Sequence, residues 1–219
     1  MKVLVTSGGT KIPIDRVRSI TNMSKGTFGS KIAEVFMGNG HQVDFLMAKD
    51  SRMPTRIKPG MLQDVLTYVT FEEYENGLHC CLDGYPDIVI LAAAVSDYGV
   101  ENYVDGKIRS NEDELIIRLK KLPKLISKVR GIAPKTFIVG FKLLVDSTEQ
   151  ELKEAMYNSY TSNRLNMVIG NDLRDIKNDN HTLMILNEFG EWKSFNKKEH
   201  NPLEQRVYEE IVRCYNGKN

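Results

Sequence analysis

Short apolar runs recur along the chain, and the segments between them carry the 3.6-residue period of amphipathic helices. Alternation of this kind is typical of a parallel sheet covered by helices on both faces, because parallel neighbours need crossover connections. The pattern therefore predicts an α/β protein. The first predicted strands are Val3–Thr6, Val43–Met47, Val65–Thr70, Ile88–Ala92 and Phe137–Gly140.

The spacing of apolar residues also predicts several helices. In the first of them, residues 27–37, Ile32 and Phe36 lie one turn apart on the same face, and Gly38-Asn39-Gly40 provides a stop signal. Three later helices are predicted at Lys121–Val129, Thr148–Tyr160 and Leu203–Tyr215.

The last third of the chain adds an antiparallel feature. Strands are predicted at Asn166–Asn171, Thr182–Leu186 and Glu191–Phe195, and Glu188-Phe189-Gly190 has the composition of a hairpin turn. Because the sequence shows no linker or internal repeat, residues 1–219 are expected to form a single domain. The complete prediction is a three-layer, Rossmann-like fold with a mainly parallel sheet, helices on both faces and a C-terminal antiparallel hairpin extension.

Charge and composition argue against several classes of binding partner. Thirty basic and 29 acidic side chains leave a formal net charge of +1, so no overall field favours nucleic acid or an anionic membrane surface. The three cysteines fit no metal spacing, which indicates reduced packing residues. We find no cleavable leader after Met1 and no apolar run near the roughly 18 residues of a membrane span. These properties favour a cytoplasmic location.

Two glycine-containing loops are the strongest local signal. Thr6-Ser7-Gly8-Gly9-Thr10 follows the first strand, and residues 22–29 (Asn-Met-Ser-Lys-Gly-Thr-Phe-Gly) lead into the first helix. Glycine lets a backbone approach a ligand closely, and the first turn of a helix offers unpaired N–H groups and partial positive charge to an anion. The loops predict a phosphate or nucleotide site, although glycines also close ordinary βα turns.

A second candidate element is the polar, irregular stretch at about residues 98–113, which carries Lys107 and Arg109. It follows the strand at Ile88–Ala92 on its carboxyl side, where open α/β sheets bind ligands. We expect a mobile loop that can close over a substrate.

Several motifs occur in a specific order. They are Ser7-Gly8-Gly9-Thr10, residues 13–18 (Pro-Ile-Asp-Arg-Val-Arg), residues 22–29, residues 92–98 (Ala-Ala-Ala-Val-Ser-Asp-Tyr), Lys107, Gly140-Phe141-Lys142-Leu143 and Asn171-Asp172. Together they resemble the phosphopantothenate–cysteine ligase family over nearly the whole chain. The resemblance implies joining of 4'-phosphopantothenate to L-cysteine through an acyl-nucleotide intermediate, a step of coenzyme A biosynthesis that releases nucleoside monophosphate and pyrophosphate.

The resemblance implies catalytic roles for two residues. Lys107 stands where the family has a lysine needed to form the acyl-nucleotide, and a cation there offsets the repulsion between a carboxylate and the triphosphate. Asn22 matches the family's asparagine that assists the second half-reaction, in which the acyl oxygen gains charge. From the residues alone, a solvated loop lysine is the ordinary interpretation of Lys107, and a helix cap or turn residue is the ordinary interpretation of Asn22.

The remaining implied site residues bind substrate or nucleotide. Among the substrate residues, the resemblance suggests Arg18 for the phosphate of phosphopantothenate, but a surface ion pair is an alternative for Arg18. Turn capping, core packing and an Asx turn are the ordinary alternatives for Asp97, Phe141 and Asn171, respectively. The implied substrate residues are Arg18, Ala93, Ala94 and Asp97, and the implied nucleotide residues are Gly9, Ser24, Gly26, Gly29, Arg109, Phe141 and Asn171.

The chain also departs from the family pattern. The loop motif is Lys107-Ile108-Arg109-Ser110, with one cation fewer than the family's usual sequence, and residues 155–170 contain Arg164 but none of the lysines that many relatives have there. Arg164, Lys142 or a cluster at Lys120, Lys121 and Lys124 are candidates to replace them.

The resemblance further implies CTP or ATP as co-substrate, with CTP favoured, Mg²⁺ carried mainly by the phosphates, and a homodimer whose loop completes the neighbouring site. No metal-ligand cluster is predicted. Two other classes stay open from the sequence: an NAD(P)-dependent oxidoreductase, since Asp50 lies about 20 residues after Gly29, and a nucleotide-binding module without catalysis.

Overall fold

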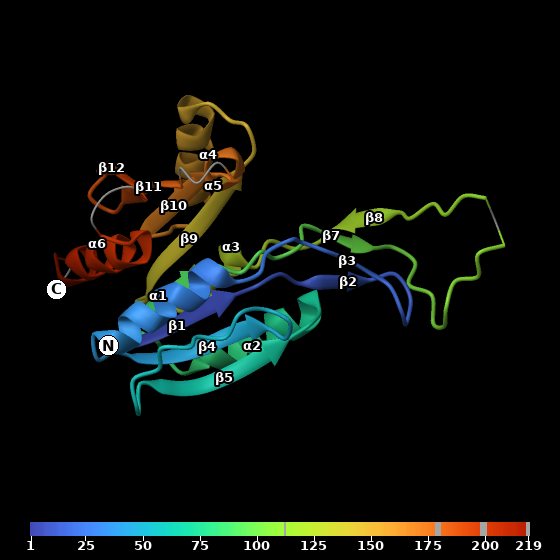
Figure 1. Ribbon diagram of the computed structural model, residues 1–219, viewed down its shortest axis with the longest axis horizontal. Helices are drawn as coiled ribbons and strands as arrows, with labels where there is room; N and C mark the ends of the chain where they lie inside the picture. Colours follow the sequence, from blue (N-terminus) through green and yellow to red (C-terminus); the bar gives the residue numbers. More distant parts are fainter. Residues whose placement is uncertain (112, 178–180, 198–200, 218–219) are drawn as a thin grey trace.

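The computed structural model describes residues 1–111, 113–177, 181–197 and 201–217, and within them eight strands form one central sheet (Figure 1). The spatial order is β12-β11-β10-β9-β6-β1-β4-β5. All neighbours from β10 to β5 pair in parallel, whereas β11 pairs antiparallel with both β10 and β12. The strands are β1 (Lys2–Ser7), β4 (Gln42–Ala48), β5 (Leu62–Tyr68), β6 (Ile88–Leu91), β9 (Phe137–Leu144), β10 (Met167–Asp172), β11 (Thr182–Asn187) and β12 (Trp192–Asn196).

Helices cover both faces of this sheet. One face packs against α1 (Thr27–Gly38) and α6 (Leu203–Gly217), and the other packs against α2 (Phe71–Asp83), α3 (Ile126–Ile132) and α4 (Glu149–Ser162). Residues alternate between the faces along β1, so that Val3 and Val5 join the first core and Leu4 joins the second. The predicted three-layer fold and its antiparallel extension are thus confirmed.

The helix starts follow the expected capping chemistry. Thr70 and Glu73 form a capping box at the start of α2, and Thr148 and Glu151 form another at the start of α4. A short helix, α5 (Leu173–Lys177), follows β10 directly.

One helix prediction, Lys121–Val129, is wrong in its first half. Lys121 ends strand β8 (Leu119–Lys121), which pairs with β7 (Tyr98–Val100), and α3 begins only at Ile126. Pro123 explains the difference, because the residue before a proline is disfavoured in the helical region. The stretch expected to be irregular from residue 98 likewise begins with the strand β7.

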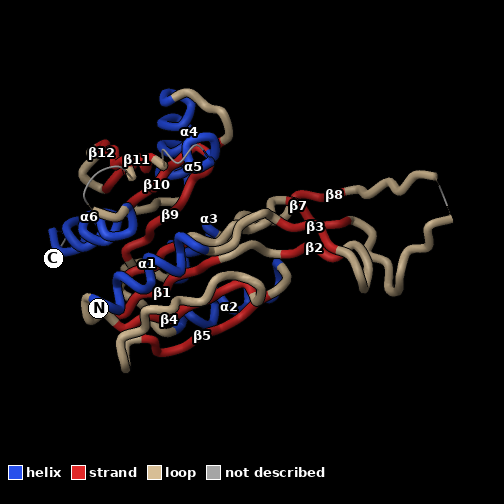
Figure 2. The backbone as a smooth tube through the Cα atoms, viewed as in Figure 1, coloured by secondary structure: helices blue, strands red, loops and turns tan. Residues whose placement is uncertain are grey.

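A narrow arm projects from the carboxyl ends of the central strands (Figure 1). We define it as residues 11–21, with β2 (Lys11–Pro13) and β3 (Ser19–Thr21), together with the described residues of 98–121. Figure 2 shows that most of its outer half is loop. The two halves are tied together because the Val104 N–H donates to the Ile14 carbonyl at 3.1 Å and the Arg16 N–H donates to the Gly106 carbonyl at 3.0 Å.

Two further findings concern the described residues. None of their helices combines the length and the apolar character that crossing a membrane requires. Cys80, Cys81 and Cys214 are all free thiols. Cys81 and Cys214 are buried, as expected of packing residues, whereas Cys80 is exposed, so that the packing prediction is wrong for Cys80.

Candidate functional site

The site lies where the strand order reverses. The chain runs from β1 outward to β4 and β5, and then crosses to β6 on the other side of β1, so the carboxyl ends of β1 and β6 flank a topological switch point. The loops that leave these two strands are joined, because the Ala94 N–H donates to the Gly8 carbonyl at 2.7 Å and the Thr10 N–H donates to the Ala94 carbonyl at 3.3 Å. The sequence motifs around Gly8 and Ala94 therefore form one structural unit.

The amino terminus of α1 opens onto the same place. Gly26 is its N-cap residue, has a φ of 69° and provides no capping side chain, while its carbonyl accepts a hydrogen bond from the Ser7 hydroxyl at 2.9 Å. The first-turn N–H groups of a helix have no partner within the helix, and they carry partial positive charge. This end of α1 is therefore suited to an anionic group such as phosphate.

We expect Gly26→Ala to lower stability and to weaken binding of an anionic ligand at the start of α1. A Cβ atom at this position would lie 2.7 Å from the Ser7 Oγ and 3.1 Å from the Gly8 N, in a backbone conformation that L side chains rarely adopt. Such strain costs about 1–3 kcal/mol. Thermal unfolding with and without CTP measures both effects, and Gly38→Ala in the same helix is the control, since nothing lies within 4 Å of its added Cβ. Equal behaviour of the two variants would contradict this expectation.

The larger of two clefts at this edge has a volume of about 1080 Å³. Its walls come from the loop before α1, the loop after β6, the segment before α3, the end of β9 and the start of α6. A cleft of this size is at the upper end of the range for small-molecule sites. It brings together eight predicted site residues, namely Ser24, Gly26, Gly29, Ala93, Ala94, Asp97, Phe141 and Asn171.

The charged lining of the cleft is mainly positive. Five lysines face two carboxylates, and both carboxylates are already in ion pairs: Asp97 with Lys124 at 2.7 Å and Glu204 with Lys31 at 3.3 Å. An excess of cations favours a ligand with several negative charges. The lysines are Lys25, Lys31, Lys124, Lys142 and Lys197.

Some of these lysines are candidates to replace the lysines that many relatives have in the segment corresponding to residues 155–170. Lys142 and Lys124, two of the proposed replacements, line the cleft, whereas Arg164 lies just after α4 and is not part of the lining. Sequence reasoning missed Lys31, although its position four residues after Thr27 places both residues on one face of α1. No sequence signal pointed to Lys197.

Aromatic side chains form one end of the cleft. Phe28 contacts Phe141 edge to face at a centroid distance of 6.0 Å and contacts the His181 ring at 5.8 Å. The Asn171 side-chain amide lies within hydrogen-bonding distance, 3.3 Å, of the His181 Nε2. Burial, assisted by the nearby Lys197, lowers the pKa of His181 and favours the neutral ring. Flat apolar faces beside an amide suit a nucleobase. The family resemblance implied Phe141 and Asn171 as site residues, but not the neighbouring rings of Phe28 and His181.

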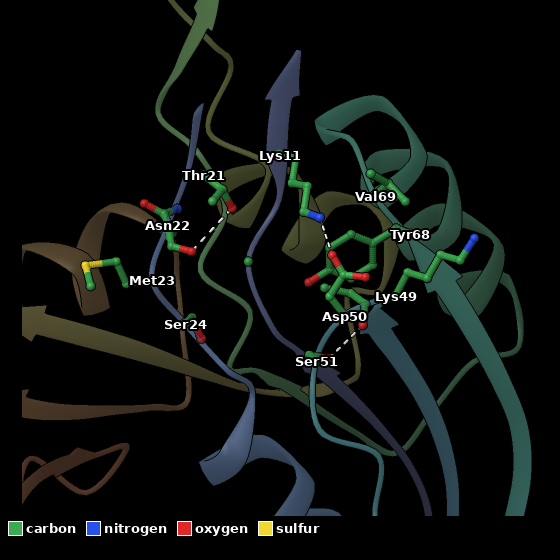
Figure 3. A pocket seen from close by; sticks show the side chains of 12 residues that line it. Lys11, Thr21, Asn22, Met23, Ser24, Lys49, Asp50, Ser51, Tyr68 and Val69 are labelled. Atoms are coloured by element: carbon green, nitrogen blue, oxygen red, sulfur yellow. Dashed lines mark hydrogen bonds and ion pairs between the residues drawn. The ribbon is translucent and has the colours of Figure 1, made fainter. Parts of the chain in front are cut away.

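Asn22 and Gly9 lie at a second, smaller pocket (Figure 3). The Asn22 Nδ2 donates to the Ala94 carbonyl at 2.8 Å, so its amide is held against a loop that lines the large cleft. Ser24 lines both pockets, and Asn22 therefore stands close to their boundary. Asp50, the acidic residue of the nicotinamide alternative, lies in this small pocket and is ion-paired with Lys11.

The other predicted cations lie on the arm, outside the lining of the large cleft. Lys107 and Arg109 are exposed there. The Arg18 guanidinium donates to the Asp15 carboxylate at 2.6 Å and to the Ile108 carbonyl at 3.0 Å, so that it fixes the backbone next to Lys107.

Asp15 is the residue that anchors this part of the arm. It is 2% exposed, and its carboxylate accepts hydrogen bonds from the Arg18 guanidinium and from the Ile108 N–H at 3.0 Å. These donors, with the Arg18 guanidinium first, hold its pKa well below the usual range. The segment around Lys107 is thus attached to a fixed ion pair and is not an independent loop.

The fold and the site define a Rossmann-like α/β protein with a glycine-lined, lysine-rich ligand cleft at its topological switch point. Residues 1–215 match the family model described as "DNA/pantothenate metabolism flavoprotein C-terminal domain". The chain belongs to this family, which confirms the relationship that the sequence motifs indicate.

Individual relatives support this family membership. The chain is 32% identical over 212 residues, or 96% of its length and 50% of the relative's, to the coenzyme A biosynthesis bifunctional protein CoaBC of Thermococcus kodakarensis. It is 30% identical to the phosphopantothenate–cysteine ligase of Homo sapiens, in an alignment covering 66% of this chain and 64% of the relative. The chain thus spans about half the length of the bifunctional relative.

Solved structures give the same relationship. A DNA/pantothenate metabolism flavoprotein from Streptococcus pneumoniae superposes with a TM-score of 0.86 at 28% identity, and each chain is covered completely. A mutant Cab2 in complex with phosphopantothenate-cysteine superposes with a TM-score of 0.82 at 25% identity, covering 99% of this chain and 86% of the other.

Proposed function

We propose that this chain acts as a phosphopantothenate–cysteine ligase. In the first half-reaction, the carboxylate of 4'-phosphopantothenate attacks the α-phosphorus of a nucleoside triphosphate, which gives an acyl-nucleotide and pyrophosphate. In the second, the cysteine amine displaces the nucleoside monophosphate and forms an amide. The family membership and the names of the relatives support this activity.

The observation that carries the proposal is the composition of the large cleft. It joins a helix amino terminus, five lysines and an aromatic end in one cavity. The helix terminus and the lysines suit a triphosphate, and the rings of Phe28 and Phe141 suit the base. Ala93 and Ala94 leave space beside the loop after β6 for the pantothenate arm.

Magnesium is proposed as a companion of the nucleotide. Among the described residues, no group of three or more His, Cys, Asp or Glu side chains is placed to hold a metal ion. The two carboxylates of the cleft are paired with lysines. Mg²⁺ commonly keeps several waters and is bound mostly through substrate phosphates, so these residues fit an ion that arrives with the triphosphate. There it would offset phosphate charge.

Product formation tests the proposal. Purified protein is incubated with 4'-phosphopantothenate, L-cysteine, Mg²⁺ and either CTP or ATP, and 4'-phosphopantothenoylcysteine and pyrophosphate are quantified. We expect both products in equal amounts, with CTP preferred. Thermal shifts with CTP and with NADPH provide a second readout, because a bound ligand stabilises the folded state. Stabilisation by NADPH alone would favour the oxidoreductase, and stabilisation by CTP without turnover would favour a non-catalytic module.

The arm supports a homodimer as the active form. Lys107 lies outside the lining of the large cleft of its own chain, and the arm projects away from the sheet (Figure 1). It also exposes several large apolar side chains, among them Ile116, which is 78% exposed. Exposed apolar surface of this kind is characteristic of association sites. We therefore propose that the arm of one copy completes the cleft of its partner.

Mixing two inactive variants tests this arrangement. Lys107→Ala and Asn22→Ala each lack one catalytic group, but a mixed dimer contains one site with an intact Asn22 and an intact partner arm. Random exchange of subunits is expected to restore about a quarter of the wild-type activity, since half of the dimers are mixed and one of their two sites is complete. Mixtures with no more activity than the separate variants would contradict the shared site.

A further inference from the structure

The small pocket beside Asn22 is separate from the large cleft, although the two share Ser24 (Figure 3). It has a volume of about 230 Å³, roughly a fifth of that of the cleft. Its walls come from the loop after β1, the strand β3 with the residues that follow it, and the ends of β4 and β5.

The lining of the pocket carries two lysines, Lys11 and Lys49, and one carboxylate, Asp50. Figure 3 shows the Lys49 side chain extending away from Asn22, so that Lys11 and Asp50 are the charged pair that faces the pocket. The Lys11 ammonium and the Asp50 carboxylate form an ion pair, and Figure 3 shows this pair across the pocket from Asn22. The Lys11 N–H donates to the Val69 carbonyl at 2.8 Å, and the Lys49 N–H donates to the Tyr68 carbonyl at 2.8 Å. Both segments are therefore held by the end of β5, while the side chains of Lys11 and Asp50 are partly exposed at 35% and 65%.

We propose that this small pocket is the binding site for L-cysteine, bound as a zwitterion with its carboxylate on Lys11 and its ammonium group on Asp50. This inference rests on the proposed ligase function, and it assigns one of the substrates of that reaction to a place of its own. The ion pair between Lys11 and Asp50 would separate, so that each side chain binds the opposite charge of the amino acid.

Size and charge both favour an amino acid over the other substrates. The pocket is smaller than the roughly 300–1,000 Å³ of sites for drug-sized ligands, so a nucleotide or phosphopantothenate belongs in the large cleft. A paired cation and anion complement a zwitterion, whereas a phosphate would meet the repulsion of Asp50. Lys11 also lowers the pKa of Asp50, a carboxyl group that is ionised at neutral pH even without this shift.

The small pocket lies next to the place where the acyl group would be transferred to cysteine. Asn22 lies on its wall, with its amide held on the Ala94 carbonyl beside the large cleft, where the acyl-nucleotide would form. An amine leaving Asp50 toward Asn22 would approach this acyl group. There the C–N bond forms, the bond from the acyl carbon to the phosphate oxygen breaks, and its electron pair leaves with the nucleoside monophosphate. The ammonium group loses two protons to water in the overall step.

The test separates the two half-reactions. Exchange of labelled pyrophosphate into CTP in the presence of 4'-phosphopantothenate needs no cysteine, whereas product formation does. In Lys11→Ala and in Asp50→Asn we expect the KM for cysteine to rise by about tenfold or more, while the exchange rate stays within about twofold of the wild type. Lys58→Ala and Asp64→Asn, at exposed positions outside the pocket lining, are the controls and should leave the KM unchanged.

A double variant distinguishes binding from a merely structural ion pair. Lys11→Asp combined with Asp50→Lys can restore an ion pair but exchanges the positions of the two charges. If the pair binds cysteine, the KM stays raised in the double variant. If the pair only supports the fold, the double variant recovers the wild-type KM, and the proposal is overturned. An unchanged KM in both single variants would overturn it as well, whereas wild-type protein without any pyrophosphate exchange would instead refute the ligase function.

Discussion

Replacing Lys107 with alanine is expected to reduce formation of the acyl-nucleotide by about 10²–10³-fold, the usual effect of removing one group that stabilises developing charge in a transition state. A carboxylate that approaches the α-phosphorus meets several negative charges, and the fixed lysines of the cleft offset only part of this repulsion. The rate of pyrophosphate exchange with 4'-phosphopantothenate and without cysteine measures this step directly.

Two variants control for indirect effects of the Lys107 substitution. Lys107→Arg keeps the charge and should retain part of the activity, although the guanidinium differs in shape from the ammonium group. Arg118→Ala removes an exposed cation elsewhere on the arm and should leave the exchange rate unchanged. A Lys107→Ala protein that exchanges pyrophosphate at the wild-type rate would contradict a role for this lysine in activation.

Replacing Asn22 with alanine should affect the other half of the reaction. The acyl-nucleotide should still form, because the lysines and the amino terminus of α1 are unchanged, but its transfer to cysteine should slow by about 10²-fold or more. Rapid quenching of the reaction should then show acyl-nucleotide accumulating in Asn22→Ala and not in the wild type. The contrast with Lys107→Ala is what assigns the two residues to different steps.

The loss of the hydrogen bond from Asn22 to the Ala94 carbonyl must be separated from the loss of catalysis. A single partly exposed hydrogen bond contributes only about 0.5–1.5 kcal/mol, so thermal unfolding of Asn22→Ala should stay close to that of the wild type. If both half-reactions slow equally and the melting temperature falls, Asn22 supports the loop structure and is not a catalytic residue.

Much of the fold was predictable because its signals are local. The apolar runs gave the parallel strands, Gly38-Asn39-Gly40 marked the end of α1, and Glu188-Phe189-Gly190 marked the turn between β11 and β12. Gly26 was recognisable because a helix that begins beside a ligand needs an unobstructed backbone, and its φ of 69° agrees with this.

The arm was not predictable in the same way. Its strands are short, and its stability depends on contacts between segments about 90 residues apart, such as Asp15 with the Ile108 N–H. At Lys121 the local pattern is misleading. The apolar residues that follow it fit a helical period, but Lys121 itself pairs with Tyr98 in a strand. Strands of three residues, such as β7 and β8, are too short to show the alternation by which a longer strand is recognised.

The site likewise contains residues that could be predicted from the sequence and residues that could not. Ala94 and Ser24, which follow a strand and precede a helix, respectively, were implied as site residues by the family resemblance, and both line the large cleft. His181 and Lys197 reach the cleft through tertiary packing of the C-terminal region, and nothing in their sequence neighbourhood distinguishes them. The pairing of Lys11 with Asp50 is also purely tertiary, because Lys11 begins β2 and Asp50 lies on the loop after β4.

The most direct test of the central claim is pyrophosphate exchange by the unmodified protein in the absence of cysteine. The account predicts that labelled pyrophosphate enters CTP or ATP only when both 4'-phosphopantothenate and Mg²⁺ are present, because the cleft joins the carboxylate to the nucleotide before cysteine reacts. Exchange that does not depend on 4'-phosphopantothenate, or no exchange with either nucleotide, would contradict it.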